Sequence, residues 1–149
     1  LKMYLTGSKT VSVDAQGRIT LPAEYRDDFK EAGNKVCLIL VKGALWGFTP
    51  EGHKEWVESC FPNGFNPRSK KDKALRLGLN AKTVTVEIDK SGRVALGKIA
   101  QSDLEKLSLG REAVVVGDAD HFAVYNTEVW AEKQAELDVD IDALLDDED

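Results

Sequence analysis

Hydrophobic and polar residues alternate in the same pattern at two places in the chain. The pattern covers residues 11–21 (VSVDAQGRITL) and, 75 residues later, residues 86–96 (VEIDKSGRVAL). Asp, Gly and Arg occupy the same offsets in both segments. Alternation with a period of two residues predicts half-buried strands, and a glycine at the reversal supplies the positive φ that a tight turn needs. Each segment is therefore predicted to form a β-hairpin.

The repeat continues beyond each predicted hairpin. Pro22 is expected to begin a helix that ends at Gly33, and Ser102–Glu105 has the form of a capping box ahead of Leu107. Strand-like runs at residues 36–41 and 113–116 follow, and then second strands that end near Phe48 and Tyr125. Each copy closes with a short tryptophan-bearing helix, opened by Thr49-Pro50 for Trp56 and by Asn126-Thr127 for Trp130. The two tryptophans are expected to be equivalent positions of one repeated module.

Residues 61–67 form a break between the copies, rich in turn-forming residues. After it, residues 67–79 are predicted to form a basic helix, which carries Arg68, Lys70, Lys71, Lys73 and Arg76. Such a charge run is typical of a solvated linker, and we do not assign DNA reading to it. The expected divisions are a first module at 4–60, a linker at 61–82, a second module at 83–136 and a tail at 137–149.

The charge is unevenly distributed along the chain. The net charge is -6, but residues 137–149 contain seven acids and no base, so the remaining residues carry a net charge of +1. We expect this tail to be solvated and disordered. A DNA-binding surface on the rest would come from clustered bases rather than from overall charge.

The chain shows no arrangement typical of an enzyme, a metal site or a membrane protein. We find no nucleophile with a base, no carboxylate pair and no metal-ligand spacing, and we expect neither a cofactor nor a metal. His53 and His121 are interpreted as structural, and Cys37 and Cys60 as small apolar side chains in a reducing compartment. The longest aliphatic run is far too short to span a bilayer, and the N-terminus lacks a secretory pattern, so we expect a cytoplasmic protein.

The Asp of each repeated segment, Asp14 or Asp89, stands just before the predicted turn. Its carboxylate can accept hydrogen bonds from nearby backbone N–H groups, and with Gly17 or Gly92 it would shape the loop. The Arg that follows is then held near a loop tip, where ligand contacts are frequent. From the residues alone, two interpretations stay open: an ion pair that staples the hairpin, or an arginine that contacts a ligand.

The repeated Asp-x-x-Gly-Arg segments, each followed by a tryptophan-bearing helix, resemble the MraZ family over residues 4–136. The resemblance implies an α+β fold of two tandem SpoVT/AbrB-like modules, whose swapped hairpins interlock into a small β-barrel with short flanking helices. It also implies a nucleoid-associated transcriptional regulator, typically a repressor of the division and cell wall gene cluster. Such a protein binds direct repeats in double-stranded DNA as a ring-shaped homo-oligomer.

The resemblance places the DNA contacts at the loop tips, with Arg18 and Arg93 as the main candidates. The further candidates are Gln16, Lys90 and Ser91 at the loop tips. Lys9 and Arg26 are expected to flank the first loop as phosphate contacts. The chain departs from the family at Gly97, where members keep a proline, and this leaves open where the second helix starts. The three tryptophans, Trp46 among them, are interpreted as packing residues.

A second hypothesis is an antitoxin whose swapped-hairpin domain binds DNA while an acidic tail captures a partner. Antitoxins of this type carry one hairpin unit and a disordered tail. Two units fill most of this chain, which favours the regulator.

Overall fold

The computed structural model describes residues 3–147, and its elements follow the same order in both halves of the chain. The first half contains β1 (Ser8–Ser12), β2 (Arg18–Thr20), α1 (Ala23–Glu31), β3 (Lys35–Val41), β4 (Ala44–Phe48) and α2 (Pro50–Ser59). After the linker helix α3 (Lys70–Lys82), the second contains β5 (Val84–Glu87), β6 (Arg93–Ala95), α4 (Gln101–Leu107), β7 (Glu112–Asp118), β8 (His121–Tyr125) and α5 (Thr127–Leu145). The predicted tandem repeat is thus present in the fold.

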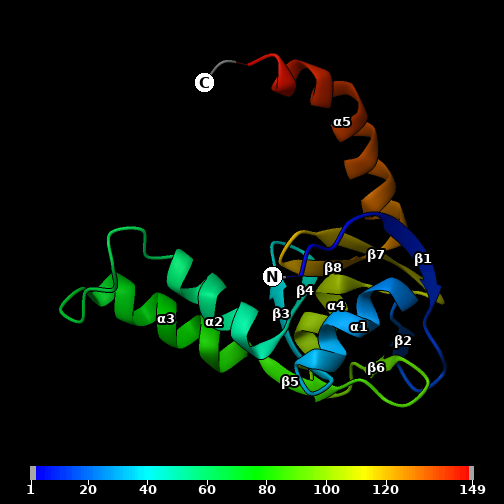
Figure 1. The fold of residues 1–149 in the computed structure, drawn as a ribbon, viewed down its shortest axis with the longest axis horizontal. Coiled ribbons are helices and arrows are strands. Elements are labelled where there is room, and N and C mark those ends of the chain that lie inside the picture. Colours follow the sequence, from blue (N-terminus) through cyan, green and yellow to red (C-terminus); the bar gives the residue numbers. More distant parts are fainter. Residues whose placement is uncertain (1–2, 148–149) are drawn as a thin grey trace.

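The two repeats exchange their first strands. The main sheet has six antiparallel strands in the order β1-β7-β8-β4-β3-β5, so β1 pairs with β7 of the second repeat and β5 pairs with β3 of the first. A separate two-stranded ribbon joins the equivalent strands β2 and β6. From one edge the order is β1, β7, β8, and from the other edge it is the equivalent strands β5, β3, β4. The two repeats are therefore related by approximate twofold symmetry. They share one core, and the predicted boundaries separate repeats rather than independent domains (Figure 1).

Two expectations about the strands need correction. The strands flanking each turn do not form a regular hairpin, because β1 and β5 belong to the main sheet whereas β2 and β6 form the ribbon. Beside the first turn, the chain segments meet at an isolated bridge between Val13 and Ile19. The sheet also does not close into a barrel among the described residues, because β1 and β5 are its two edges. Pairing β2 with β6 instead places Ile19 opposite Val94, and both side chains are fully buried. The α+β fold class itself is confirmed.

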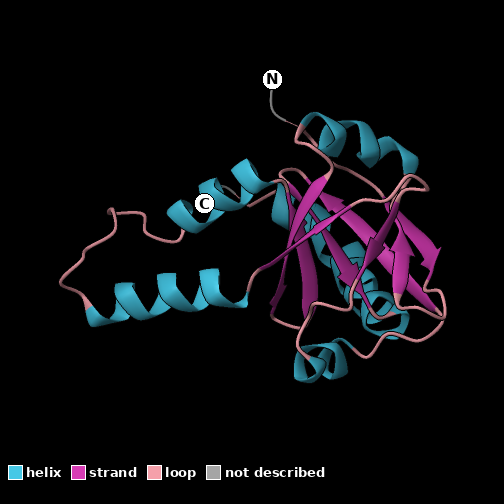
Figure 2. Ribbon diagram, turned by 90° about the horizontal axis from the view of Figure 1, so that it is seen from below, coloured by secondary structure: helices cyan, strands magenta, loops and turns pink. Residues whose placement is uncertain are grey.

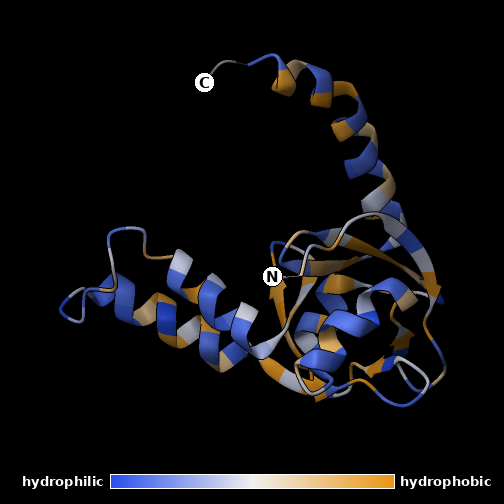
Figure 3. Cartoon of the chain, in the orientation of Figure 1, coloured by the Kyte–Doolittle hydropathy of each residue, from blue (hydrophilic) through white to orange (hydrophobic). Residues whose placement is uncertain are grey.

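The core lies between the main sheet, the ribbon and the two short helices α1 and α4. Helix α1 presents Tyr25 and Phe29 to Phe122 of β8, and the Phe29 and Phe122 rings meet edge to face at 5.6 Å. Helix α4 contributes Leu107 to the same cluster. Figure 3 shows hydrophobic residues concentrated on the strands. Burial of this shared apolar surface holds the repeats together.

The helix ends agree in part with the expected signals. Thr49 and Asn126 cap α2 and α5 through their side chains, as their positions predicted. Helix α4, however, begins at Gln101 after Ala100, without a side-chain cap, so Ser102 does not open a capping box. The tryptophans are not equivalent either: Trp56 is the seventh residue of α2, whereas Trp130 is the fourth of α5.

Two helical segments project from the body. Helices α2 and α3 form an arm on one side, and α5 rises from another part of the body (Figures 1 and 2). Residues 137–145, which we expected to be disordered, belong to α5, while Glu148 and Asp149 lie outside the described residues. In the described part of the chain, no helix combines the length and apolar character that a membrane span requires.

Candidate nucleic-acid interface

The first loop, between β1 and β2, is a tight turn. The Gly17 N–H donates to the Asp14 carbonyl at 3.0 Å, and the Asp14 N–H donates to the Arg18 carbonyl at 2.9 Å. Gly17 has φ +73°, a conformation that L side chains rarely adopt, so glycine is favoured here. The chain therefore reverses over four residues and starts β2 at Arg18.

The Asp14 carboxylate holds this turn together. Its Oδ1 accepts hydrogen bonds from the Gln16 and Arg18 backbone N–H groups at 2.9 Å each, and its Oδ2 accepts one from Arg18 Nε at 2.8 Å. The backbone N–H of Arg18 is the main cause that lowers the pKa of Asp14. Asp14 is therefore ionised at neutral pH and orients both the backbone and the side chain of Arg18.

The second loop, between β5 and β6, has the same construction. Asp89 Oδ1 accepts from the Ser91 and Arg93 N–H groups at 2.9 Å each, and Oδ2 accepts from Arg93 Nε at 3.1 Å. The Arg93 N–H is again the main cause that lowers the pKa of Asp89, and Gly92 has φ +79°. The loop-shaping roles expected of Asp14, Gly17, Asp89 and Gly92 thus agree with the hydrogen bonds.

The two loops lie next to each other. The Leu96 N–H donates to the Gly17 carbonyl at 3.1 Å, and the Leu21 N–H donates to the Gly92 carbonyl at 2.9 Å. Arg18 Nη1 also lies 3.9 Å from Asp89 Oδ2, which links the first loop to the second. Because β2 and β6 pair, the two arginines of one chain share one end of the molecule.

Both open interpretations of the arginines have support in this geometry. Each arginine forms an ion pair with the Asp of its own loop, yet that hydrogen bond uses only Nε. A guanidinium has five N–H donors, so its outer edge retains donors for a second partner. The side chains keep 26% of their surface exposed for Arg18 and 34% for Arg93. The ion pair therefore orients a guanidinium that solvent can still reach.

The sequence of this chain decides its family. It matches the family described as "MraZ protein, putative antitoxin-like" over residues 4–70 and 79–144, which is nearly the whole chain. The chain belongs to the MraZ family. The two matched segments correspond to the two repeats, and members of this family are transcriptional regulators rather than enzymes.

Relatives from distant bacteria are similar over comparable lengths, and each is named Transcriptional regulator MraZ. The chain is 28% identical to that of Pseudoalteromonas translucida over 145 residues, 94% of this chain and 90% of the relative. It is 30% identical to that of Proteus mirabilis over 128 residues, 83% and 80% of the two chains. Identity to the relative from Corynebacterium urealyticum is 27% over 141 residues, 92% and 91%. The similarity therefore extends across both repeats.

The structure of this MraZ chain places Arg26 beside the second loop. Arg26 Nε donates to the Leu21 carbonyl at 3.1 Å, and its guanidinium occupies the space that a side chain at position 92 would need. Gln16, Lys90 and Ser91 are exposed at the two loop tips, as expected. Lys9 lies apart, because four residues of extended strand, about 13 Å, separate it from Val13 at the start of the first loop.

Sequence reasoning missed Arg111. Its carbonyl accepts the Val13 N–H at 2.8 Å, and the residue is exposed, so it adds a basic residue beside the first loop. This proximity follows from the pairing of β1 with β7, which joins segments about a hundred residues apart. Nothing in the local sequence of either segment indicates that pairing.

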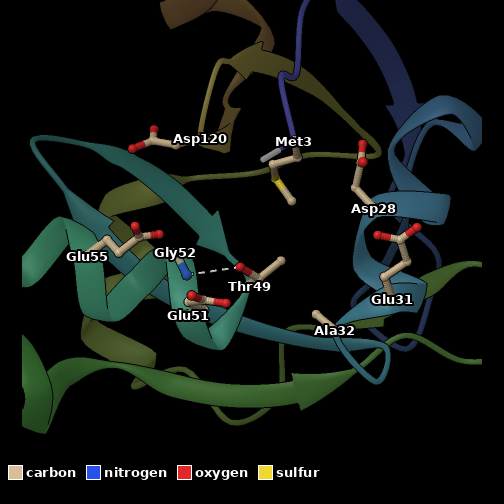
Figure 4. Close-up of a pocket in the computed structure, with 9 residues that line it drawn as sticks. All are labelled: Met3, Asp28, Glu31, Ala32, Thr49, Glu51, Gly52, Glu55 and Asp120. Carbon is tan, nitrogen blue, oxygen red and sulfur yellow. Dashed lines mark hydrogen bonds between the residues drawn. The ribbon is translucent and has the colours of Figure 1, made fainter. Parts of the chain in front are cut away.

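A pocket of about 430 Å³ lies at the opposite end of α1 and is acidic. Figure 4 shows carboxylates from α1, from α2 and from the β7–β8 turn around the Met3 side chain, namely Asp28, Glu31, Glu51, Glu55 and Asp120. Negative charge of this density repels phosphate, so the pocket is not expected to add to a DNA-binding surface formed by the two loops. No group of three or more metal-ligating side chains is positioned to hold a metal ion within residues 3–147.

The remaining sequence candidates pack against neighbouring side chains. His121 stacks on Trp46 at 4.1 Å and contacts Asp120 through Nδ1 at 2.8 Å. His53 contacts the Thr83 hydroxyl at 2.9 Å, and burial lowers its pKa. Trp56 stacks on Phe48 and Trp130 packs on Tyr125, while Cys37 is buried and Cys60 half-buried. These contacts agree with structural roles.

Proposed function

We propose that this chain is a DNA-binding transcriptional repressor that contacts the double helix with its two Asp-x-x-Gly-Arg loops. The observation that carries the proposal is the adjacency of the loops, which puts Arg18 and Arg93 on one end of the molecule. The names of the relatives support the regulatory part. A repressor of this kind works in the cytoplasm, at the nucleoid.

The chemistry of arginine fits this task. Its planar guanidinium can bind guanine O6 and N7 with two hydrogen bonds in the major groove, or can bind a phosphate. A base contact would contribute about 1–3 kcal/mol of discrimination between sequences. The Asp–Arg ion pairs fix the Nε edge of each arginine, so less side-chain entropy is lost when the outer edge binds DNA.

Self-assembly would multiply these contacts. Two arginines form a weak binding site, whereas linked sites raise avidity by about 10² to 10⁴ when their spacing matches that of the ligand. We therefore propose that a ring-shaped homo-oligomer engages direct repeats with successive pairs of loops. The proposed target lies upstream of the division and cell wall gene cluster, as the family resemblance implies.

The test is a binding titration on upstream DNA with direct repeats, at two salt concentrations. Arg18→Ala and Arg93→Ala should each weaken binding about tenfold or more, while Arg68→Ala in the linker should bind like the parent. A lost base contact would lower the preference for the repeats over random DNA, and a lost phosphate contact would reduce the salt slope by about one. Parental affinity in both loop variants would overturn the proposal.

A further inference from the structure

Two helices of this chain contain no buried residue. They are α3, which has 13 residues, and α5, which has 19. From residue 131 to residue 147 every side chain is exposed. Helices in water gain most of their stability from packing an apolar face against another element. Neither helix buries an apolar face completely against its own chain, which indicates that each has a partner beyond it.

The two helices carry opposite charge. Helix α3 contains five bases and one acid, and α5 contains six acids and one base. Opposite charge at this density favours association and selects the partner. The surface that best fits each helix is therefore one that carries the charge of the other helix.

Helix α3 uses only one side for contacts with its own chain. On that side the Arg76 guanidinium lies 3.5 Å from the centre of the Phe65 ring, and Leu79 packs on the cluster around Phe48. The opposite side presents Leu77, which is 71% exposed. Spacings of three and four residues place Ala74, Ala81 and Lys73 beside Leu77, and Lys70 lies one turn before Ala74, so the free side is an apolar strip flanked by bases.

Helix α5 presents the complementary strip. Leu137, Ile141 and Leu144 follow at spacings of four and three residues, and their exposed fractions are 43%, 55% and 63%. Asp138 and Asp140 flank the strip on its two sides. Figure 3 shows these hydrophobic patches along the otherwise hydrophilic helix. Exposed apolar surface of this kind, rimmed by polar residues, marks an interaction site.

We propose that the apolar strip of α5 packs along the free side of α3 in a second copy of this chain. Figure 1 shows the two helices on separate projections of one molecule, so they do not meet within a chain. A contact between different surfaces of two copies is heterologous, and it generates a ring when the rotation closes. This inference rests on the proposed self-assembly and assigns the residues that carry it.

The test uses two charge-reversed chains and measures molar mass by light scattering. One chain carries Lys70→Glu and Lys73→Glu, and the other carries Asp138→Lys and Asp140→Lys. Each alone should fall from the mass of the parent assembly to the 16.4 kDa monomer, because the substituted residues that flank one strip then carry the same charge as the residues that flank the other. Lys71→Glu and Glu132→Lys, which lie away from the two strips, should keep the parental mass.

Mixing the two reversed chains should restore the assembly. In the mixture, at every contact between unlike chains, acidic residues again flank one strip and basic residues flank the other. Parental mass in either reversed chain, or no recovery on mixing, would overturn the pairing of α3 with α5. Loss of DNA binding with unchanged mass in the Lys70→Glu, Lys73→Glu chain would also overturn it, because α3 would then contact DNA. The arginine titration is independent of these results, so the loops can be confirmed while this interface fails.

Discussion

Replacing Gly92 with alanine should be more damaging than the same replacement at Gly17, although the two loops have the same backbone. Both glycines have positive φ, which costs an L residue about 1–2 kcal/mol. Alanine recovers about 0.4–1 kcal/mol of this by restricting the unfolded chain. At Gly17 nothing lies within 4 Å of an added Cβ, so the net destabilisation should be about 1 kcal/mol.

At Gly92 the added methyl group would occupy the place of the Arg26 guanidinium. Arg26 must then move and lose its 3.1 Å hydrogen bond to the Leu21 carbonyl, which adds about 0.5–1.5 kcal/mol. In a chain of this length each kcal/mol lowers Tm by about 2–4 °C. Gly92→Ala should therefore melt a few degrees below Gly17→Ala. It should also bind DNA more weakly, since the charge of Arg26 leaves the second loop.

Thermal unfolding of both variants, in the parent and in an Arg26→Ala background, measures this coupling as a double-mutant cycle. Without the guanidinium, Gly92→Ala should cost no more than Gly17→Ala. An equal cost of Gly92→Ala in both backgrounds would refute the placement of Arg26 over the second loop. A cost of Gly17→Ala near zero would refute the strain argument for both turns.

Three other changes test the core and the titrating groups. Gly47→Ala puts a methyl group into the buried Phe122 ring and should cost about 1–3 kcal/mol, seen as a lower Tm. Burial lowers the pKa of His53, so neutral His53 contributes its full share to the stability of the fold above pH 6.5. This contribution declines as the pH falls toward the folded pKa. In urea unfolding, His53→Gln should remove this pH dependence. The lowered pKa of Asp14 likewise gives stability above pH 3.8 that is lost in acid, and Asp14→Asn should flatten that limb.

Features with short-range causes could be predicted from the sequence. The turn at Asp14 depends on hydrogen bonds that span two to four residues, and its pattern predicted both the reversal and the position of Arg18. Thr49 and Asn126 cap helices through bonds to residues two or three positions away, so the starts of α2 and α5 were also predicted. Such signals are contained within one segment of the chain.

Features that depend on distant partners could not be predicted from the residues. Alternation in residues 11–21 predicts strands on both sides of the turn, but it does not determine which strands pair, and the hairpin expectation was wrong because β1 pairs with β7. Helix α4 starts at Gln101, before the predicted cap at Ser102, and it follows a turn in which the buried Ile99 donates its N–H to the Leu96 carbonyl at 3.1 Å. The many acids after residue 137 led to the expectation of a disordered tail, although Leu137, Ile141 and Leu144 have the four- and three-residue spacing of one helix face.

The strand exchange also explains why one chain carries both loops at one end. Each loop is closed by its own Asp. The position of one loop relative to the other is set by the pairing of β2 with β6. Two backbone hydrogen bonds, Leu96 to Gly17 and Leu21 to Gly92, add to this pairing. A chain with a single repeat would need a second copy to form that ribbon. Here the spacing of the two arginines is built into the monomer, so the proposed assembly would set only the spacing between successive pairs. A substitution that weakens the ribbon, such as one at buried Ile19 or Val94, should thus disturb DNA binding through both loops together.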